Sequence, residues 1–175
     1  EPKVWYEHEE LGYNYRMSNI VAAIGVGQLR HMDAILAKKR QIFAGYQARL
    51  GSLAEVGFMP EAAYGRCTRW LTVMEIRSQV LNGGGLNVGR ATGGSPSEGV
   101  MRVIDSLERA NIESRPVWKP MHLQPVFRGT KVIGGQVSER LFADGLCLPS
   151  GAGLSSQEVD RVCGIVAGAL GVCAH

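Results

Sequence analysis

Apolar residues recur at helical spacing along one long stretch of the chain, from Ser18 to Leu50. They are Ile20, Ile24, Leu29, Met32, Ile35, Leu36, Ile42, Phe43, Tyr46 and Leu50, which is the pattern of one face of a helix. Ser18 is the predicted N-cap, because its hydroxyl can accept from the unpaired amides of the first turn. Gly51 is the predicted stop. One continuous helix would be about 50 Å long at roughly 1.5 Å per residue, which suits a connector between domains or subunits.

Two glycines interrupt this apolar pattern. Gly25 and Gly27 each disfavour the helix by about 1 kcal/mol relative to alanine. The sequence leaves two explanations open. Either another backbone approaches closely here, at a domain or subunit contact, or the helix bends or frays.

The remainder of the chain alternates between strand and helix patterns. Residues 51–65 are predicted to form a loop, and Ser95-Pro96-Ser97-Glu98 is predicted to start a helix, with Ser95 as the cap and Pro96 at the first helical position. A capping box, Ser155 to Glu158, opens the last helix. The predicted strands are 68–77, 112–117 and 146–148, and the predicted helices are 96–110, 137–144 and 156–170. This order predicts an α+β domain with helices packed on one side of a short sheet.

A glycine-rich run at residues 79–95 invites comparison with phosphate-binding loops. Starting at Gly84 it reads Gly-x-x-x-x-Gly, but Arg90 and Ala91 stand where the motif requires Lys and then Ser or Thr. The run is therefore predicted to be a connection and not a nucleotide site.

Composition narrows the class of protein further. Hydrophobic residues make up 45% and charged residues 20%, and the formal charge of +3 is spread along the chain. This footprint argues against a nucleic-acid partner, and no apolar run reaches the roughly 20 residues of a membrane span. Cys67, Cys147, Cys163 and Cys173 show neither Cys-x-x-Cys pairing nor a histidine at metal-ligand spacing. Reduced thiols, no metal site and a cytoplasmic protein are expected.

Three motifs occur in a fixed order along the chain. Gly-Tyr-Asn-Tyr-Arg-Met-Ser (12–18) precedes the apolar stretch, Thr-Arg-Trp-Leu-Thr occupies 68–72, and Glu-Ser-Arg-Pro-Val-Trp-Lys-Pro-Met-His-Leu-Gln-Pro occupies 113–125. Together they resemble the sugar aminotransferases of the DegT/DnrJ/EryC1/StrS family, which use pyridoxal 5'-phosphate. The third motif resembles the branch that acts on UDP-linked 4-keto-6-deoxy sugars.

This resemblance implies an architecture and an activity. The chain looks like the C-terminal portion of a fold-type I aminotransferase, with residues 1–17 as an active-site loop segment, 18–50 as a long interdomain or interface helix, and 51–175 as the small C-terminal α+β domain. In the family, the catalytic lysine and the carboxylate that faces the cofactor ring precede the first motif. The chain alone is therefore expected to be inactive. The full-length protein is expected to be a homodimer that moves an amino group from an amino acid, glutamate being the expected donor, to a keto-sugar nucleotide.

The resemblance also assigns roles to individual residues. Asn14 matches the asparagine that reaches across the dimer to the cofactor phosphate of the neighbouring subunit. Arg16, Trp118 and His122 become candidates for substrate binding, and Arg16 could pair with a diphosphate or with a donor carboxylate. Simpler explanations remain open from the sequence: a turn for Asn14, a salt bridge for Arg16 and a structural role for His122. Lys119 does not stand in the motif of the catalytic lysine, and Arg115 either faces substrate or holds its strand.

Two alternatives belong to other classes. One is a non-catalytic dimerisation or interaction module derived from the same fold. The other is a family member that modifies a small carbocycle in place of a nucleotide sugar.

Overall fold

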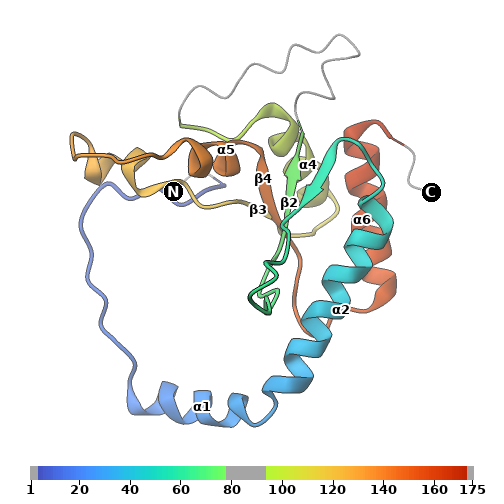
Figure 1. Ribbon diagram of the computed structural model, residues 1–175, viewed down its shortest axis with the longest axis horizontal. Coiled ribbons are helices and arrows are strands. Elements are labelled where there is room, and N and C mark those ends of the chain that lie inside the picture. Colours follow the sequence, from blue (N-terminus) through green and yellow to red (C-terminus); the bar gives the residue numbers. More distant parts are fainter. Residues whose placement is uncertain (1–3, 78–93, 173–175) are drawn as a thin grey trace.

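Four short antiparallel strands form a sheet in the order β1-β2-β4-β3 (Figure 1). The computed structural model describes residues 4–77 and 94–172, so the glycine-rich connection lies almost wholly outside the described residues, as does Cys173. The strands are β1 (Val56–Phe58), β2 (Thr72–Ile76), β3 (Arg115–Pro116) and β4 (Gly145–Leu148). The prediction of a loop across residues 51–65 was wrong for β1, because Val56 pairs with Ile76 and Phe58 with Met74 at the edge of β2.

Three helices cover one face of this sheet. They are α2 (Met32–Leu50), α4 (Glu98–Arg109) and α6 (Ser156–Leu170). Side chains alternate along β2, so that Thr72, Met74 and Ile76 are buried on the helix side. The predicted apolar faces of α4 and α6 meet there, and the buried core cluster is Ile42, Tyr46, Leu50, Val56, Met74, Ile76, Val100, Val103, Ile104, Leu107, Leu146, Leu148, Val159, Val162, Cys163, Val166, Ala167 and Leu170. The α+β class is confirmed.

The two predicted helix starts had different outcomes. The capping box of α6 is confirmed: the Ser155 hydroxyl accepts from Glu158 N, and the Glu158 carboxylate accepts from Ser155 N at 2.8 Å. The prediction for α4 was wrong by two residues, because Ser97 is the cap. Ser97 N also donates to the Ala143 carbonyl at 2.7 Å, a bond with a distant segment that sequence spacing could not indicate.

Helix α5 (Gln136–Asp144) runs directly into β4 and contacts the sheet differently. Its Arg140 pairs with Glu75, whose side chain points away from the face that Met74 and Ile76 bury. Phe142 is buried and packs edge-on against Trp5, with ring centroids 6.4 Å apart. The start of the described chain is thereby held against α5.

The prediction of one helix over residues 18–50 was wrong. The stretch forms α1 (Asn19–Leu29) and α2, which meet at a 73° bend. The Ser18 cap and the end at Gly51 are confirmed. His31 has φ −110° and ψ 11°, outside the helical region, and breaks the hydrogen-bond ladder two residues after the end of the glycine-weakened α1. Figure 1 shows α1 standing apart from the sheet, and none of its residues is buried.

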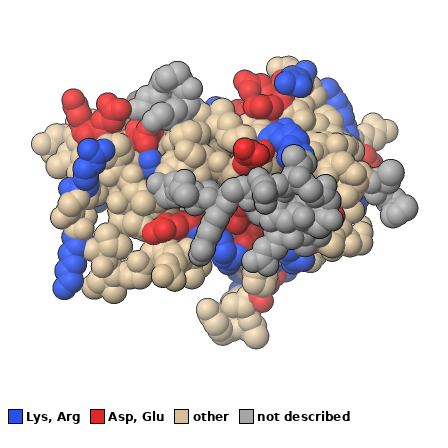
Figure 2. Space-filling model, turned by 90° about the horizontal axis from the view of Figure 1, so that it is seen from above, with Lys and Arg blue, Asp and Glu red and all other residues tan. Residues whose placement is uncertain are grey.

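In the part of the chain that the structure describes, no single helix is both long and apolar enough to cross a bilayer. The bent pair of α1 and α2 meets those criteria only when the two helices are counted together. Figure 2 shows basic and acidic side chains interspersed on one face of the molecule, in line with the small net charge.

Candidate functional site

A tight turn holds the first motif. The Asn14 side-chain oxygen accepts from the backbone N–H of Arg16 at 2.8 Å, and Arg16 takes a left-handed conformation with φ 69°. Asparagine favours such turns because its side chain bonds the backbone two residues on. With its oxygen engaged, Asn14 has its side-chain NH₂ left to donate, and both residues are exposed. An uncharged donor just before a helix N-terminus suits a phosphate oxygen.

The second and third motifs meet through two tryptophans. Trp70 and Trp118 stack with ring centroids 5.8 Å apart and an interplanar angle of 20°. Both rings keep a large exposed fraction, 66% for Trp70 and 48% for Trp118. An exposed, rigid pair of aromatic faces is a suitable platform for a sugar or a flat ring.

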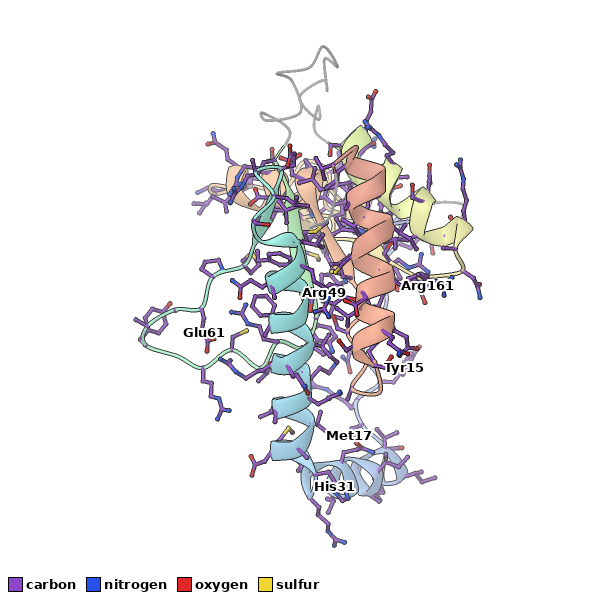
Figure 3. The ribbon with its side chains drawn as sticks, turned by 90° about the vertical axis from the view of Figure 1, so that its right-hand side faces the viewer. Tyr15, Met17, His31, Arg49, Glu61 and Arg161 are labelled. Carbon is purple, nitrogen blue, oxygen red and sulfur yellow. The ribbon has the colours of Figure 1, made fainter. Side chains whose placement is uncertain are left out.

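Helix α2 holds the loop that carries Trp70. Lys39 Nζ donates to the Trp70 carbonyl at 2.9 Å and to the Ser150 carbonyl at 2.7 Å. The Arg69 guanidinium lies 3.7 Å from the centre of the Phe43 ring. Glu61, close to Arg69, accepts two hydrogen bonds from Arg40 of α2. Hydrogen bonds from Arg40 and from the Cys67 amide lower the pKa of Glu61 to about 2. Figure 3 shows Glu61 on the loop beside α2.

Trp118 also lines a cavity of about 580 Å³. The cavity lies between β3, the segment after β4 and the first turns of α6, and Tyr6, Leu71 and Ile112 add apolar wall. Its polar groups are mostly engaged, since Arg115 bonds Glu113 at 2.8 Å and Arg161 donates to the Ala110 carbonyl. The Ser114 hydroxyl is buried without a hydrogen-bond partner among the described residues.

His122 lies away from this cavity, in the 3-10 turn η2 (Met121–Leu123). Its Nε2 is 2.8 Å from Glu139 Oε1 on α5. Gly135, which precedes α5 with φ 112°, leaves room for the ring, because a β-carbon there would come within 3.0 Å of it. Glu139 orients the imidazole and leaves Nδ1 as the nitrogen able to face another group.

The N-terminal segment docks onto the loop that carries Trp118 and His122. Gln124 is 3% exposed and bonds three backbone groups: it accepts from His8 N at 2.8 Å and donates to the Tyr6 and Lys119 carbonyls. The Lys119 ammonium pairs with the Glu7 carboxylate. Glu7 begins the acidic run Glu7-His8-Glu9-Glu10, a composition typical of a solvated loop, yet its side chain is only 9% exposed because it faces Lys119.

The structure thus brings together only some of the predicted site residues. Trp118 lines the cavity and His122 follows in the next turn, whereas Asn14 and Arg16 lie on an exposed segment outside it. Sequence reasoning missed Tyr6, Trp70, Gln124 and Glu139 as neighbours of these residues. Trp70 stood within a quoted motif and could have been found, but the other three gave no local signal. Within the described residues no cluster of three potential metal ligands occurs.

Comparison with known proteins agrees with the three motifs. The sequence model of the DegT/DnrJ/EryC1/StrS aminotransferase family matches residues 1–167. The chain belongs to this family.

Two curated relatives and one solved structure illustrate the match. EpsN of Bacillus subtilis, named as a pyridoxal phosphate-dependent aminotransferase, is 40% identical over 166 residues, which cover 93% of this chain and 38% of EpsN. GDP-perosamine synthase of Caulobacter vibrioides is 34% identical, with 93% of this chain and 40% of that protein covered. The structure of DesI with its TDP-sugar product superposes with a TM-score of 0.71 at 21% identity, covering 88% of this chain and 36% of DesI. The chain therefore spans about two fifths of the length of its relatives.

Proposed function

We propose that this chain is the C-terminal part of a pyridoxal 5'-phosphate-dependent aminotransferase that transfers an amino group from an amino acid, glutamate being the expected donor, to a keto-sugar nucleotide. The family match over residues 1–167 carries the proposal. Two of the similar proteins support a nucleotide-linked sugar product: one is named GDP-perosamine synthase, and the structure of DesI holds its TDP-sugar product. A homodimer is part of the proposal, because Asn14 would serve the cofactor of the neighbouring subunit.

The residues of the Asn14 turn fit the cofactor phosphate. The side-chain NH₂ of Asn14 is an uncharged donor, and the bond from Arg16 N to its oxygen fixes which end of the amide faces outward. When bound, the cofactor supplies the electron sink for the exchange of the amino group. Asn14 would hold the phosphate, and Arg16 would pair with the substrate diphosphate or with the carboxylate of the donor.

Trp118 and His122 would bind the sugar. Trp118 presents half of its surface on the stacked platform with Trp70, and a sugar ring packs well on such a face. His122, oriented by Glu139, would donate or accept one hydrogen bond through Nδ1. Both groups bind and orient, and neither is assigned the chemical step.

The chain alone would be inactive, because the two best-held lysines that the structure describes are not free to react. Lys119 is paired with Glu7 and 7% exposed, and Lys39 donates to two carbonyls. Neither ammonium can act as a nucleophile while held in this way. The catalytic amine is assigned to another part of the full-length protein.

The deciding experiment is an amino-transfer assay of the full-length protein. Glutamate would be supplied with UDP-, GDP- and TDP-linked 4-keto-6-deoxy sugars and with unlinked keto-carbocycles, and products would be identified by mass spectrometry. Amination of a nucleotide-linked sugar is expected, together with loss of cofactor retention in Asn14→Ala. Turnover of only the unlinked substrates would replace the sugar nucleotide with a small carbocycle. Absence of any turnover or cofactor absorbance would favour the non-catalytic dimerisation module.

A further inference from the structure

The segment that leads to Asn14 and the loop that carries Trp118 and His122 are joined by buried polar contacts. Figure 1 shows the first described residues of the chain lying beside that loop. Gln124 accepts from His8 N and donates to the Tyr6 carbonyl, while Val126 N donates to the His8 carbonyl at 3.1 Å. Three backbone groups of residues 6–8 are therefore held by one loop.

An ion pair reinforces this junction. The side chains of Lys119 and Glu7 are 7% and 9% exposed, unlike the exposed pair of Arg115 with Glu113, whose side chains are 46% and 76% exposed. A buried charge that loses its partner is strongly unfavourable, whereas an exposed pair contributes little. Undocking of residues 6–8 would separate the Lys119 ammonium from the Glu7 carboxylate. The segment and the loop therefore hold one another in place.

These contacts flank the candidate site residues closely. Lys119 follows Trp118 directly, and Lys119 and Gln124 lie on either side of the turn with His122. In the N-terminal segment, Asn14 is six residues beyond His8, which limits the distance between the two to about 20 Å. A shift of the junction would move the substrate loop and displace the residues from which the chain leads to Asn14.

We propose that Glu7, Lys119 and Gln124 are positioning residues that fix residues 6–8, which lead to Asn14, and the Trp118–His122 loop as one unit. This inference rests on the proposed function for its catalytic consequence, but not for the junction itself. The three residues touch neither cofactor nor substrate. They act through the backbone of residues 6–8 and 118–126.

The test uses the full-length protein and two independent measurements. Hydrogen exchange reports the amides of His8 and Val126, and steady-state kinetics separates KM for the nucleotide sugar from kcat. Lys119→Met should accelerate exchange at both amides about 100-fold, because it removes the ammonium that pairs with the buried Glu7 carboxylate. KM should rise about tenfold, with a smaller change in kcat, because substrate-binding groups are misplaced. Asp160→Asn, which removes a charge from the exposed α2–α6 pair with Arg49, is the matched control and should change neither.

Two further variants separate the charges from packing. Glu7→Leu with Lys119→Met removes both charges and should restore slow exchange and the KM of the parent protein. Gln124→Leu removes hydrogen bonds and no charge, and it should also accelerate exchange. It replaces Lys119→Met in the test if that variant does not fold. If the His8 and Val126 amides exchange no faster in Lys119→Met than in the control variant, the claim that this junction holds the two segments together is refuted. Faster exchange with an unchanged KM would overturn the positioning role. An inactive parent protein would refute the proposed function, while the exchange rates would still decide whether the junction exists.

Discussion

The C-terminal layer and the N-terminal arm of this chain, residues 9–31, contain similar apolar residues but differ in what covers them. In the layer, α2, α4 and α6 bury their apolar faces against the sheet. In the arm, Ile20, Ile24 and Leu29 are 75%, 61% and 62% exposed. A helix without a charged face is typical of one that is buried in its assembly. The contrast agrees with the proposed role of α1 at a domain or subunit contact.

Figure 3 shows how the difference is arranged. Arg49 of α2 is directed toward α6, where it bonds Asp160 and Ser156, whereas Met17 and His31 lie at the far end near α1. The same chain therefore passes from a region with many partners to one with few. Four measurements test this difference between the two regions.

The largest difference should come from a pair of identical truncations. Ile76 is fully buried and Ile24 is 61% exposed. Ile76→Ala should lower the free energy of unfolding of the 175-residue chain by about 2–5 kcal/mol, through lost burial and a cavity. Ile24→Ala should change it by less than about 0.5 kcal/mol. Urea unfolding of both variants measures this. Equal losses would mean that α1 is covered in solution, and dependence on protein concentration would identify another copy as the cover.

Thiol reactivity should separate the two buried cysteines from an exposed one. Burial raises the pKa of Cys147 and of Cys163 to about 11, whereas Cys67 is exposed. At pH 8 their thiolate fraction falls about 100-fold below that of an ordinary thiol. Timed alkylation with peptide mapping should label Cys67 before Cys147 and Cys163. Labelling of Cys163 at the same rate would show that the α2–α6 contact opens readily.

Helix caps should matter in the layer and not in the arm. Ser155 and Ser18 make the same kind of cap, on α6 and α1 respectively. Ser155→Ala should lower the free energy of unfolding by about 1 kcal/mol. Ser18→Ala should reduce helical circular dichroism slightly and leave the unfolding midpoint unchanged, because α1 makes no buried contact. A shift of the midpoint in both variants would contradict the separation of the two regions.

The smallest effect should be the pH dependence of the loop that α2 holds. The pKa of Glu61 is about 2 in the folded chain and ordinarily 4.5. A depressed pKa means that the contribution of Glu61 is complete above about pH 4.5 and is lost as pH falls through about 2. Glu61→Gln should therefore differ from the parent at pH 6 and converge with it near pH 2, measured by urea unfolding at each pH. A constant difference would show that the Arg40 contact does not depend on charge.

Local patterns were sufficient for much of the C-terminal layer. The apolar faces of α4 and α6, the Ser155–Glu158 capping box and the stop at Gly145 depend on residues within a few positions of one another. The family resemblance was visible for the same reason: each of its three motifs is a continuous run of residues. The Ser97 cap was missed because Ser97 is selected over Ser95 by a bond to Ala143, far along the chain.

For the candidate site, the sequence indicated Asn14, Arg16, Trp118 and His122 as candidates but not their surroundings. The Asn14 turn is local, since its hydrogen bond spans two residues. By contrast, the contacts of Gln124 with residues 6–8 and of His122 with Glu139 join segments that only the fold brings together. The bend between α1 and α2 also depended on tertiary structure. The spacing of apolar residues is the same for one long helix as for two shorter ones. Only α2 packs into the core, so the packing and not the spacing decided where the helix bends. The sequence alone therefore determined the family and most elements of the C-terminal layer, whereas packing decided β1, the bend between α1 and α2, and which polar groups meet.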